Sequence, residues 1–266
     1  MKNNNFHPED HTFVVCAFNE SPFLEECVQS LQAQSIHSKI LIATSTPNQL
    51  ITRIAEEYRL KVFINAGESG IAGDWNYAVS CAETPLITIA HQDDVYEPCY
   101  TEAMLSMMNA AKNPILFSSA YAELRNGKKT TDAKLLSIKR TMLLPMRAFP
   151  RSVLARRLSI SLGNPICCPS VTYISDIIKK NPFEPGLKSN LDWQQWEKLS
   201  KLKGSFLYSS EILMCHRIHA DSETSRIIGE NSRTLEDLEM FRKFWPEKTA
   251  QFLSRMYANS EKSNST

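Results

Sequence analysis

Short apolar runs rich in β-branched residues alternate with amphipathic segments through the first half of the chain, and this alternation constrains the fold more than any other feature. Each run has the length and composition of a buried strand, and the runs span 12–18, 38–44, 60–64, 85–90 and 114–120. Between them, proline follows a polar residue at Ser21-Pro22, Thr46-Pro47 and Glu97-Pro98, where the first turn of a helix needs no N–H partner. Strands that alternate with helices form parallel sheets. The sequence therefore predicts an α/β protein with a mostly parallel sheet flanked by helices.

The second half of the chain has a different pattern, in which polar and lysine-rich stretches separate the apolar runs. We expect a tryptophan-rich helix at 191–202, a charged helix at 233–255, and strands at 170–174, 205–209 and 211–216. Residues 1–11 are predicted to be a flexible N-terminus, 226–257 a helical extension and 258–266 a disordered tail. The sheet-based unit then spans 12–225.

Composition limits the class of protein and its compartment. The 266 residues are 42% hydrophobic and 22% charged with a formal net charge of +1, so a globular domain is expected and nucleic acid is not an expected partner. The seven cysteines show no C-x-x-C spacing, which is typical of reduced thiols in the cytosol. No apolar run approaches the roughly 20 residues of a membrane span, and the polar N-terminus is unlike a signal peptide. We expect a cytoplasmic protein.

An acidic pair follows the fourth predicted strand, where Leu86–Ala90 runs directly into His91-Gln92-Asp93-Asp94. Open α/β sheets bind ligands at the carboxyl ends of their strands. One or two carboxylates suffice to hold Mg²⁺ or Mn²⁺ when a diphosphate supplies further oxygen ligands. The pair is therefore a candidate metal and diphosphate site, and a cap for the following helix is the alternative.

Three stretches resemble glycosyltransferase family 2 in sequence and order: Val14–Glu20, Gly73–Ala78 and Thr84–Asp94. The resemblance implies the GT-A fold, a Rossmann-like architecture, with 12–120 as the nucleotide-sugar-binding half and 121–225 as the acceptor half. It also implies an inverting transfer of a sugar from a nucleoside-diphosphate sugar to an acceptor hydroxyl, assisted by a divalent metal, Mn²⁺ or Mg²⁺.

The family's Asp-x-Asp signature falls on His91-Gln92-Asp93, so the resemblance implies Asp93 as the metal ligand and Asp94 as a ribose or sugar contact. Histidine replaces the first acid, and which carboxylate touches the metal stays open. The family's Asp-Gly-Ser turn is replaced by Ala43-Thr-Ser-Thr-Pro47, so the identity of the donor's nucleobase stays open. The hydroxyls at 44–46 could form hydrogen bonds to the donor, and the alternative is that Thr46 caps the next helix. The implied contacts to the nucleotide-sugar are Ala17, Asn19, Glu20, Thr44, Gly73, Asn76, Gln92, Asp94 and Arg217.

Two later motifs also resemble the family. Asn190-Leu-Asp192-Trp193 resembles its acidic element before an acceptor-side helix, which implies Asp192 as the general base, with a helix cap as the alternative. Trp193 and Trp196 are candidates for stacking on a sugar or for packing in the core. Arg217-x-His219, followed by Ser222 and Thr224, resembles the family's closing motif and implies His219 as a second metal ligand or a phosphate contact.

Positive charge is concentrated between Arg125 and Arg157, next to the apolar stretch 141–146. This segment is a candidate for peripheral membrane contact at the inner face of the membrane, and a solvated surface is the alternative. The expected partners are a nucleoside-diphosphate sugar and a glycan or lipid-linked acceptor, as in polysaccharide biosynthesis. Two other functions stay open: a nucleotide-sugar-binding scaffold with little activity, and a nucleotidyltransferase, whose glycine-rich, lysine-bearing loop is missing here.

Overall fold

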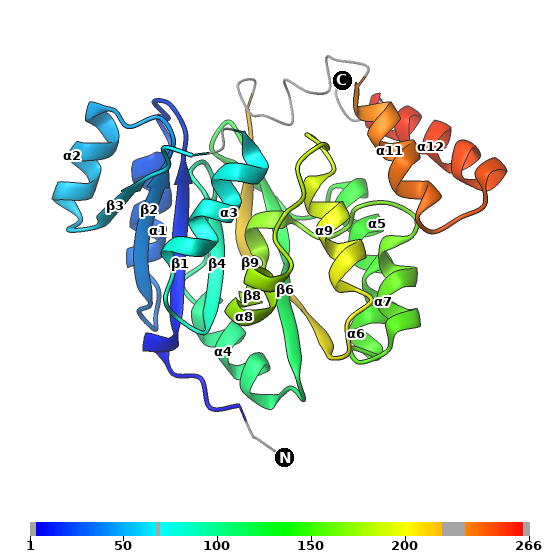
Figure 1. Ribbon diagram of the computed structural model, residues 1–266, viewed down its shortest axis with the longest axis horizontal. Coiled ribbons are helices and arrows are strands. Elements are labelled where there is room, and N and C mark those ends of the chain that lie inside the picture. Colours follow the sequence, from blue (N-terminus) through cyan, green and yellow to red (C-terminus); the bar gives the residue numbers. More distant parts are fainter. Residues whose placement is uncertain (1–3, 68–69, 220–231, 263–266) are drawn as a thin grey trace.

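The computed structural model describes residues 4–67, 70–219 and 232–262. In these ranges a nine-stranded sheet has the order β3-β2-β1-β4-β8-β6-β9-β5, with β7 paired to β6 (Figure 1). The strands are β1 His11–Ala17, β2 Lys39–Thr44, β3 Lys61–Ile64, β4 Leu86–His91, β5 Val95–Tyr96, β6 Pro114–Arg125, β7 Lys128–Thr130, β8 Thr172–Ile174 and β9 Ser205–Ile218.

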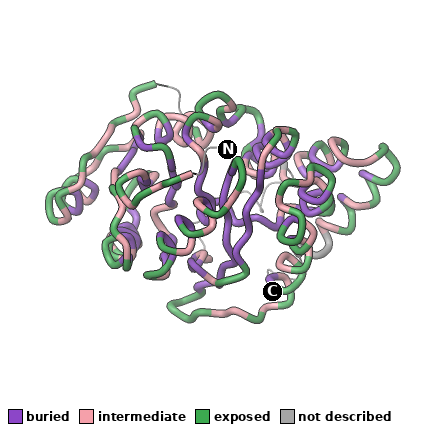
Figure 2. The backbone as a smooth tube through the Cα atoms, turned by 90° about the horizontal axis from the view of Figure 1, so that it is seen from below, coloured by how far each residue is buried: buried purple, intermediate pink, exposed green. Residues whose placement is uncertain are grey.

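The first half of the sheet confirms the predicted parallel pattern. Strand β1 pairs in parallel with β2 and β4, and β2 pairs in parallel with β3. Successive side chains of β1 pack in different hydrophobic clusters: Phe13 and Val15 belong to one cluster, and Val14 belongs to another. Both faces of the strand are therefore covered, which explains why its sequence is a continuous apolar run. Figure 2 shows that buried backbone is concentrated in the central strands.

The second half of the sheet is mixed, which corrects the expectation of a mostly parallel sheet. Strand β8 is antiparallel to both β4 and β6, and β5 is antiparallel to β9. The two strands expected at 205–209 and 211–216 are one long strand, β9, parallel to β6. Irregular register near Ser119–Ala120 accounts for the interruption in the apolar pattern, because a bulge changes the face that each side chain occupies.

Helices cover both faces of the sheet, and each of the three proline-marked helices begins slightly later than predicted. Leu24, Gln49 and Tyr100 are the first helical residues after the three prolines. The cap of α2 is Asn48, which accepts a hydrogen bond from the Ile51 N–H, so Thr46 is not the cap. The helices are α1 Leu24–Gln32, α2 Gln49–Glu57, α3 Ile71–Cys81, α4 Tyr100–Ala110, α5 Lys134–Met142, α6 Leu144–Ala148, α7 Val153–Ile160, α8 Ser175–Lys180, α9 Leu191–Leu199, α11 Ser232–Arg242 and α12 Glu247–Lys262.

Both ends of the chain differ from expectation. The segment predicted to be flexible is fastened to α4 from Asn4 onward: the Asn4 amide donates to the Met108 and Ala111 carbonyls, and Phe6 and Asn109 exchange two hydrogen bonds. The single helix expected at 233–255 is a pair, α11 and α12, and α12 continues to Lys262, beyond the expected start of a disordered tail. No helix in the described residues is long and apolar enough to span a membrane.

Candidate active site

A cavity of about 700 Å³ opens at the carboxyl ends of β1 and β4. One side of it consists of the loop after β1, the start of α3 and the end of β4. The lining also includes residues of the segments 164–169 and 188–192, Lys139 from α5 and His216 from β9. Residues from both halves of the sequence therefore meet at this edge of the sheet. The lining includes these predicted site residues: Ala17, Asn19, Glu20, Gln92, Asp93, Asp192 and His219.

The loop after β1 is held in place from two neighbouring elements. The Gln92 side chain accepts a hydrogen bond from the Phe18 N–H at 3.0 Å and donates one to the Phe18 carbonyl at 3.0 Å. The Asn19 N–H donates to the Thr46 hydroxyl, and the Asn48 amide donates to the Asn19 carbonyl. Asn19 has φ of 54°, a conformation that asparagine tolerates better than most residues. This loop thus presents a fixed surface to the cavity.

Asp93 and His219 form a pair of potential metal ligands. The Asp93 Oδ2 and His219 Nε2 atoms are 3.0 Å apart, and both side chains line the cavity. Burial alone would raise the pKa of Asp93, but the electrostatic effect of the neighbouring His91 and the hydrogen bond from His219 outweigh it, so the pKa is lowered. An ionised carboxylate beside an imidazole is a donor set that suits a divalent transition metal such as Mn²⁺.

Asp94 has a structural environment instead. Its side chain is fully buried, its Oδ1 accepts from the Arg217 N–H at 2.8 Å, and the same oxygen lies 3.0 Å from His216 Nδ1. The charge of Asp94 raises the pKa of His216 although burial opposes this. Asp94 therefore fastens β9 to the end of β4 and does not line the cavity, contrary to the expected sugar contact.

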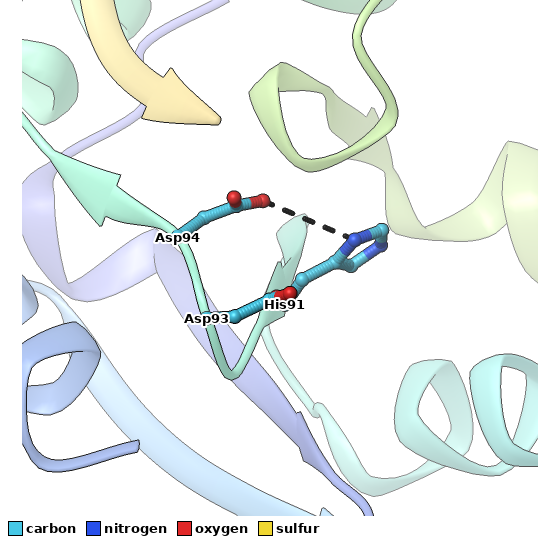
Figure 3. A group of neighbouring side chains, drawn as sticks. All are labelled: His91, Asp93 and Asp94. Carbon is cyan, nitrogen blue, oxygen red and sulfur yellow. Dashed lines mark ion pairs between the residues drawn. The ribbon is translucent and has the colours of Figure 1, made fainter. Parts of the chain in front are cut away.

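His91 occupies the position of the missing acid. Its Nδ1 faces Asp94 Oδ2 at 3.9 Å (Figure 3), and its ring stacks on Trp75 of α3 with ring centroids 5.3 Å apart. His91, Asp93 and Asp94 each offer a ligand atom within 4.8 Å of the others. Of these three, only His91 and Asp93 reach the cavity. His91 is therefore a further potential metal ligand beside Asp93.

Asp192 lies in the first turn of α9, one residue after its first helical residue, and the N-cap position belongs to Asn190. Its Oδ2 accepts a hydrogen bond from the Asn164 amide at 2.8 Å. Burial raises the pKa of Asp192, and the bond from Asn164 only partly offsets this. A carboxylate with a raised pKa that faces a cavity is suited to accept a proton, because general bases work best when their pKa approaches the working pH.

The model of the family described as Glycosyl transferase family 2 matches residues 12–172, more than half of the chain. The chain belongs to this family. It is a glycosyltransferase, and the nucleotidyltransferase alternative is not supported. No curated protein matches the chain.

Three solved structures resemble the fold of this glycosyltransferase. S. aureus TarS 1-349 in complex with UDP-GlcNAc matches with a TM-score of 0.66 and 16% identity, over 92% of this chain and 70% of that one. The mannosyltransferase PcManGT from Pyrobaculum calidifontis, in complex with GDP-Man and Mn²⁺, has a TM-score of 0.65, 12% identity and coverages of 92% and 71%. Glucosyl-3-phosphoglycerate synthase from Mycobacterium tuberculosis, in complex with Mn²⁺, UDP-Glc and phosphoglyceric acid, matches with a TM-score of 0.62 and 14% identity, over 89% of this chain and 80% of that one. These similarities confirm the predicted GT-A fold.

Four other predicted contacts of the glycosyltransferase lie away from the cavity wall. Thr44 is buried and its hydroxyl accepts from the Thr46 N–H. Asn76 exchanges hydrogen bonds with the Phe183 backbone, and Gly73 is not among the lining residues. Arg217 pairs with Glu26 at 2.6 Å and donates to the Asp93 carbonyl, so it positions the Asp93 backbone. Of its closing motif, Ser222 and Thr224 lie outside the described residues.

The two tryptophans of α9 pack in the core. Both are fully buried; the Trp193 indole N–H donates to the Ile160 carbonyl, and Trp196 stacks on Tyr173. The alternative of stacking on a sugar is therefore wrong for both. Trp75 is the tryptophan that lines the cavity.

Sequence reasoning missed two groups of lining residues. The first is Asp74 of α3, whose carboxylate accepts hydrogen bonds from Ser45 and Asn65. Asp74 places a carboxylate next to the turn after β2, where this chain lacks the aspartate of the family's Asp-Gly-Ser turn. The only sequence signal for a role of Asp74 was its position inside the Gly73–Ala78 stretch. The second is Lys139 with Tyr121, whose side chains are 3.0 Å apart. No sequence signal separated Lys139 from the surrounding basic residues.

Proposed function

We propose that this glycosyltransferase moves a sugar, with inversion, from a nucleoside-diphosphate sugar to a hydroxyl of a glycan or lipid-linked acceptor. We further propose a role in bacterial-type surface polysaccharide or glycan synthesis, in the cytoplasm at the inner face of the membrane. The observation that supports the reaction is one cavity whose lining includes both the Asp93–His219 pair and Asp192. Inverting transfer needs these two groups and no covalent intermediate.

The residues around Asp93 fit a divalent cation. Asp93 and His219 would hold it, because one carboxylate and one imidazole leave positions for diphosphate oxygens. When bound, Mn²⁺ or Mg²⁺ would neutralise charge on the departing diphosphate. Two similar structures, those of the mannosyltransferase and of the phosphoglycerate synthase, were solved with Mn²⁺ beside GDP-Man or UDP-Glc, which supports manganese and leaves the nucleobase open.

The protein's own contribution to the chemical step is proton transfer and orientation. The acceptor oxygen attacks the anomeric carbon, the bond from that carbon to the diphosphate oxygen breaks, and the acceptor's proton passes to Asp192. Asn164 donates to one Asp192 oxygen and so orients the carboxylate. The loop at 17–20, held by hydrogen bonds to Gln92, would support the nucleotide.

The alternative of a scaffold that merely binds nucleotide-sugars is not favoured. The environment of Asp192 favours an enzyme, since burial raises the pKa of this carboxyl and a buried carboxylate costs stability without helping donor binding. The replaced acid at His91 does not remove the metal pair, because Asp93 and His219 lie together without it.

The test uses thermal unfolding with nucleoside diphosphates and nucleotide-sugars, with and without Mn²⁺, on the wild type and three variants. Asp93→Ala is expected to lose the metal-dependent rise in melting temperature, because ligands stabilise the native state they bind. Asp94→Ala is expected to unfold more easily even without ligand, by about 2–4 kcal/mol, since it leaves buried partners of β9 unpaired. Asp192→Asn is expected to keep the nucleotide response and to lose turnover roughly 100- to 10,000-fold.

Each outcome decides one part of the proposal. No response to any nucleotide in the wild type would remove the assignment of the nucleotide-sugar site. If the metal-dependent rise in melting temperature is lost in Asp94→Ala and kept in Asp93→Ala, Asp94 and not Asp93 is the metal ligand. Unchanged turnover in Asp192→Asn would remove Asp192 as the base.

A further inference from the structure

Helix α7 carries a row of leucines that face solvent. Leu154 and Leu158 are one helical turn apart, and Leu162 continues the row in the turn after the helix; their exposed fractions are 79%, 50% and 47%. The opposite face of the helix, with Ala155 and Ile160, is buried. Exposed leucines at i, i+4 and i+8 form an apolar stripe of the kind that normally packs against something.

Further exposed apolar residues lie on α6 and in the connection to α7. Phe149 is 66% exposed, and Leu144 and Val153 are exposed as well. Figure 1 shows α6 and α7 on the side of the molecule away from α2 and β3, below α11 and α12 in this view. The α6–α7 surface consists of Leu144, Phe149, Val153, Leu154, Leu158 and Leu162.

The segment that contains the α6–α7 surface carries positive charge only. The sequence from 133 to 175 contains lysines and arginines and no aspartate or glutamate. Some of these cations are already engaged: Arg156 donates to carbonyls of the segment 200–204, and Arg157 pairs with Glu197 at 2.8 Å. Arg147 and Arg151 are exposed and border Phe149 in the sequence. A second copy would meet these arginines with its own if the same surface faced itself, as in a two-fold dimer.

We propose that the α6–α7 surface docks on an anionic lipid membrane. The leucines and Phe149 enter the boundary between head groups and acyl chains while Arg147 and Arg151 meet lipid phosphates, an arrangement typical of interfacial helices. This places the contact on α6–α7, within the basic segment considered from the sequence. Of the apolar stretch 141–146, Leu144 belongs to this surface, whereas Leu143 and Met146 are buried.

The position of the surface relative to the cavity links it to the reaction. Asn164 follows Leu162 and lines the cavity beside Asp192, and Lys139, next to the exposed Ile138, lines it from α5. A chain docked in this way would present the Asp192 side of the cavity close to the lipid surface. That the acceptor reaches the site from the membrane rests on the proposed function, whereas the docking itself does not.

Sedimentation with vesicles tests the docking on the full chain. We expect binding to vesicles that contain phosphatidylglycerol, weaker binding in high salt, and little binding to phosphatidylcholine alone. The double variant Leu154→Ser/Leu158→Ser should lower the partition coefficient about tenfold or more. Arg147→Gln/Arg151→Gln should lower it roughly 25-fold, since each basic residue at the surface is worth about fivefold.

Leu235→Ser is the matched control, because Leu235 is also 72% exposed but is followed on α11 by Glu236 and Asp237. It should bind vesicles like the wild type. Unchanged binding by the leucine variant, or no binding by the wild type, would overturn the proposal. A wild-type dimer in sedimentation velocity that dissociates in Leu154→Ser/Leu158→Ser would assign the surface to self-association. The nucleotide response of these variants should be unchanged, so a failure here is separate from a failure of the proposed reaction.

Discussion

At the scale of single residues, the ionisation of Asp192 depends on two opposed effects. Burial raises its pKa above the usual value for an aspartate, and the hydrogen bond from Asn164 lowers it. The base must be ionised to accept a proton, so turnover should fall as the pH drops through this raised pKa. Asn164→Ala removes the bond that favours the ionised form, and the acid limb should therefore move to higher pH.

The measurement is kcat/KM against pH for the wild type and Asn164→Ala. We expect a loss of several-fold in mildly acidic buffer and a much smaller loss at alkaline pH. Asn181→Ala is a control at a half-buried asparagine whose side-chain amide donates to the Ile177 carbonyl of α8 rather than to Asp192. A uniform loss at every pH would show that Asn164 matters for packing and not for the ionisation of Asp192.

At the scale of elements, Asn48 joins the start of α2 to the loop at the nucleotide side of the cavity. Its Oδ1 caps the helix by accepting from the Ile51 N–H, and its Nδ2 donates to the Asn19 carbonyl. Asn48→Asp keeps the cap and loses the donor, whereas Asn48→Ala loses both.

Asn48→Ala should cost about 1 kcal/mol of stability and Asn48→Asp much less. Both should weaken nucleotide binding about two- to tenfold. Chemical denaturation and nucleotide titration separate the two effects, and equal stability losses in both variants would contradict the assignment of the cap.

The elements also show which parts of the fold were open to sequence reasoning. Strands β1 to β4 were predicted because runs buried on both faces are continuously apolar, as at Phe13–Val15. The short strands β5 and β7 were missed because their residues lack an apolar run of their own; they form only where β9 and β6 offer partners. At the site, Asp93, Asp192 and His219 were predicted from motifs. Lys139 and Asp74 were not, because their approach to the cavity depends on packing between distant segments.

At the scale of the whole molecule, the C-terminal helix pair supports the segment that leads to Asp192. The Glu236 carboxylate of α11 accepts hydrogen bonds from the backbone N–H groups of Lys188, Ser189 and Asn190, at 2.9, 2.8 and 3.1 Å. The pair is itself fastened to α7, since the Trp245 indole donates to the Ser161 carbonyl. The extension beyond the family match therefore helps to build the cavity wall that contains the proposed base.

Glu236→Gln is expected to loosen this wall. It should raise the KM for the acceptor and lower kcat several-fold while leaving nucleotide affinity unchanged, because the loop at 17–20 is not involved.

Burial would raise the pKa of Glu236, but its hydrogen bonds to 188–190 outweigh this and lower it. The charged form therefore stabilises the fold above the ordinary glutamate pKa, and this contribution is lost as the pH falls through the lowered value. The free energy of unfolding of the wild type should exceed that of the variant by about 1 kcal/mol at neutral pH, since solvent partly screens this carboxylate, and the difference should close in acid. Glu239→Gln, an exposed acid on the same helix, is the control and should change none of these quantities. If the two variants behave alike in acceptor kinetics and in unfolding at both pH values, α11 contributes packing alone, and the segment 188–190 keeps its place without the Glu236 charge.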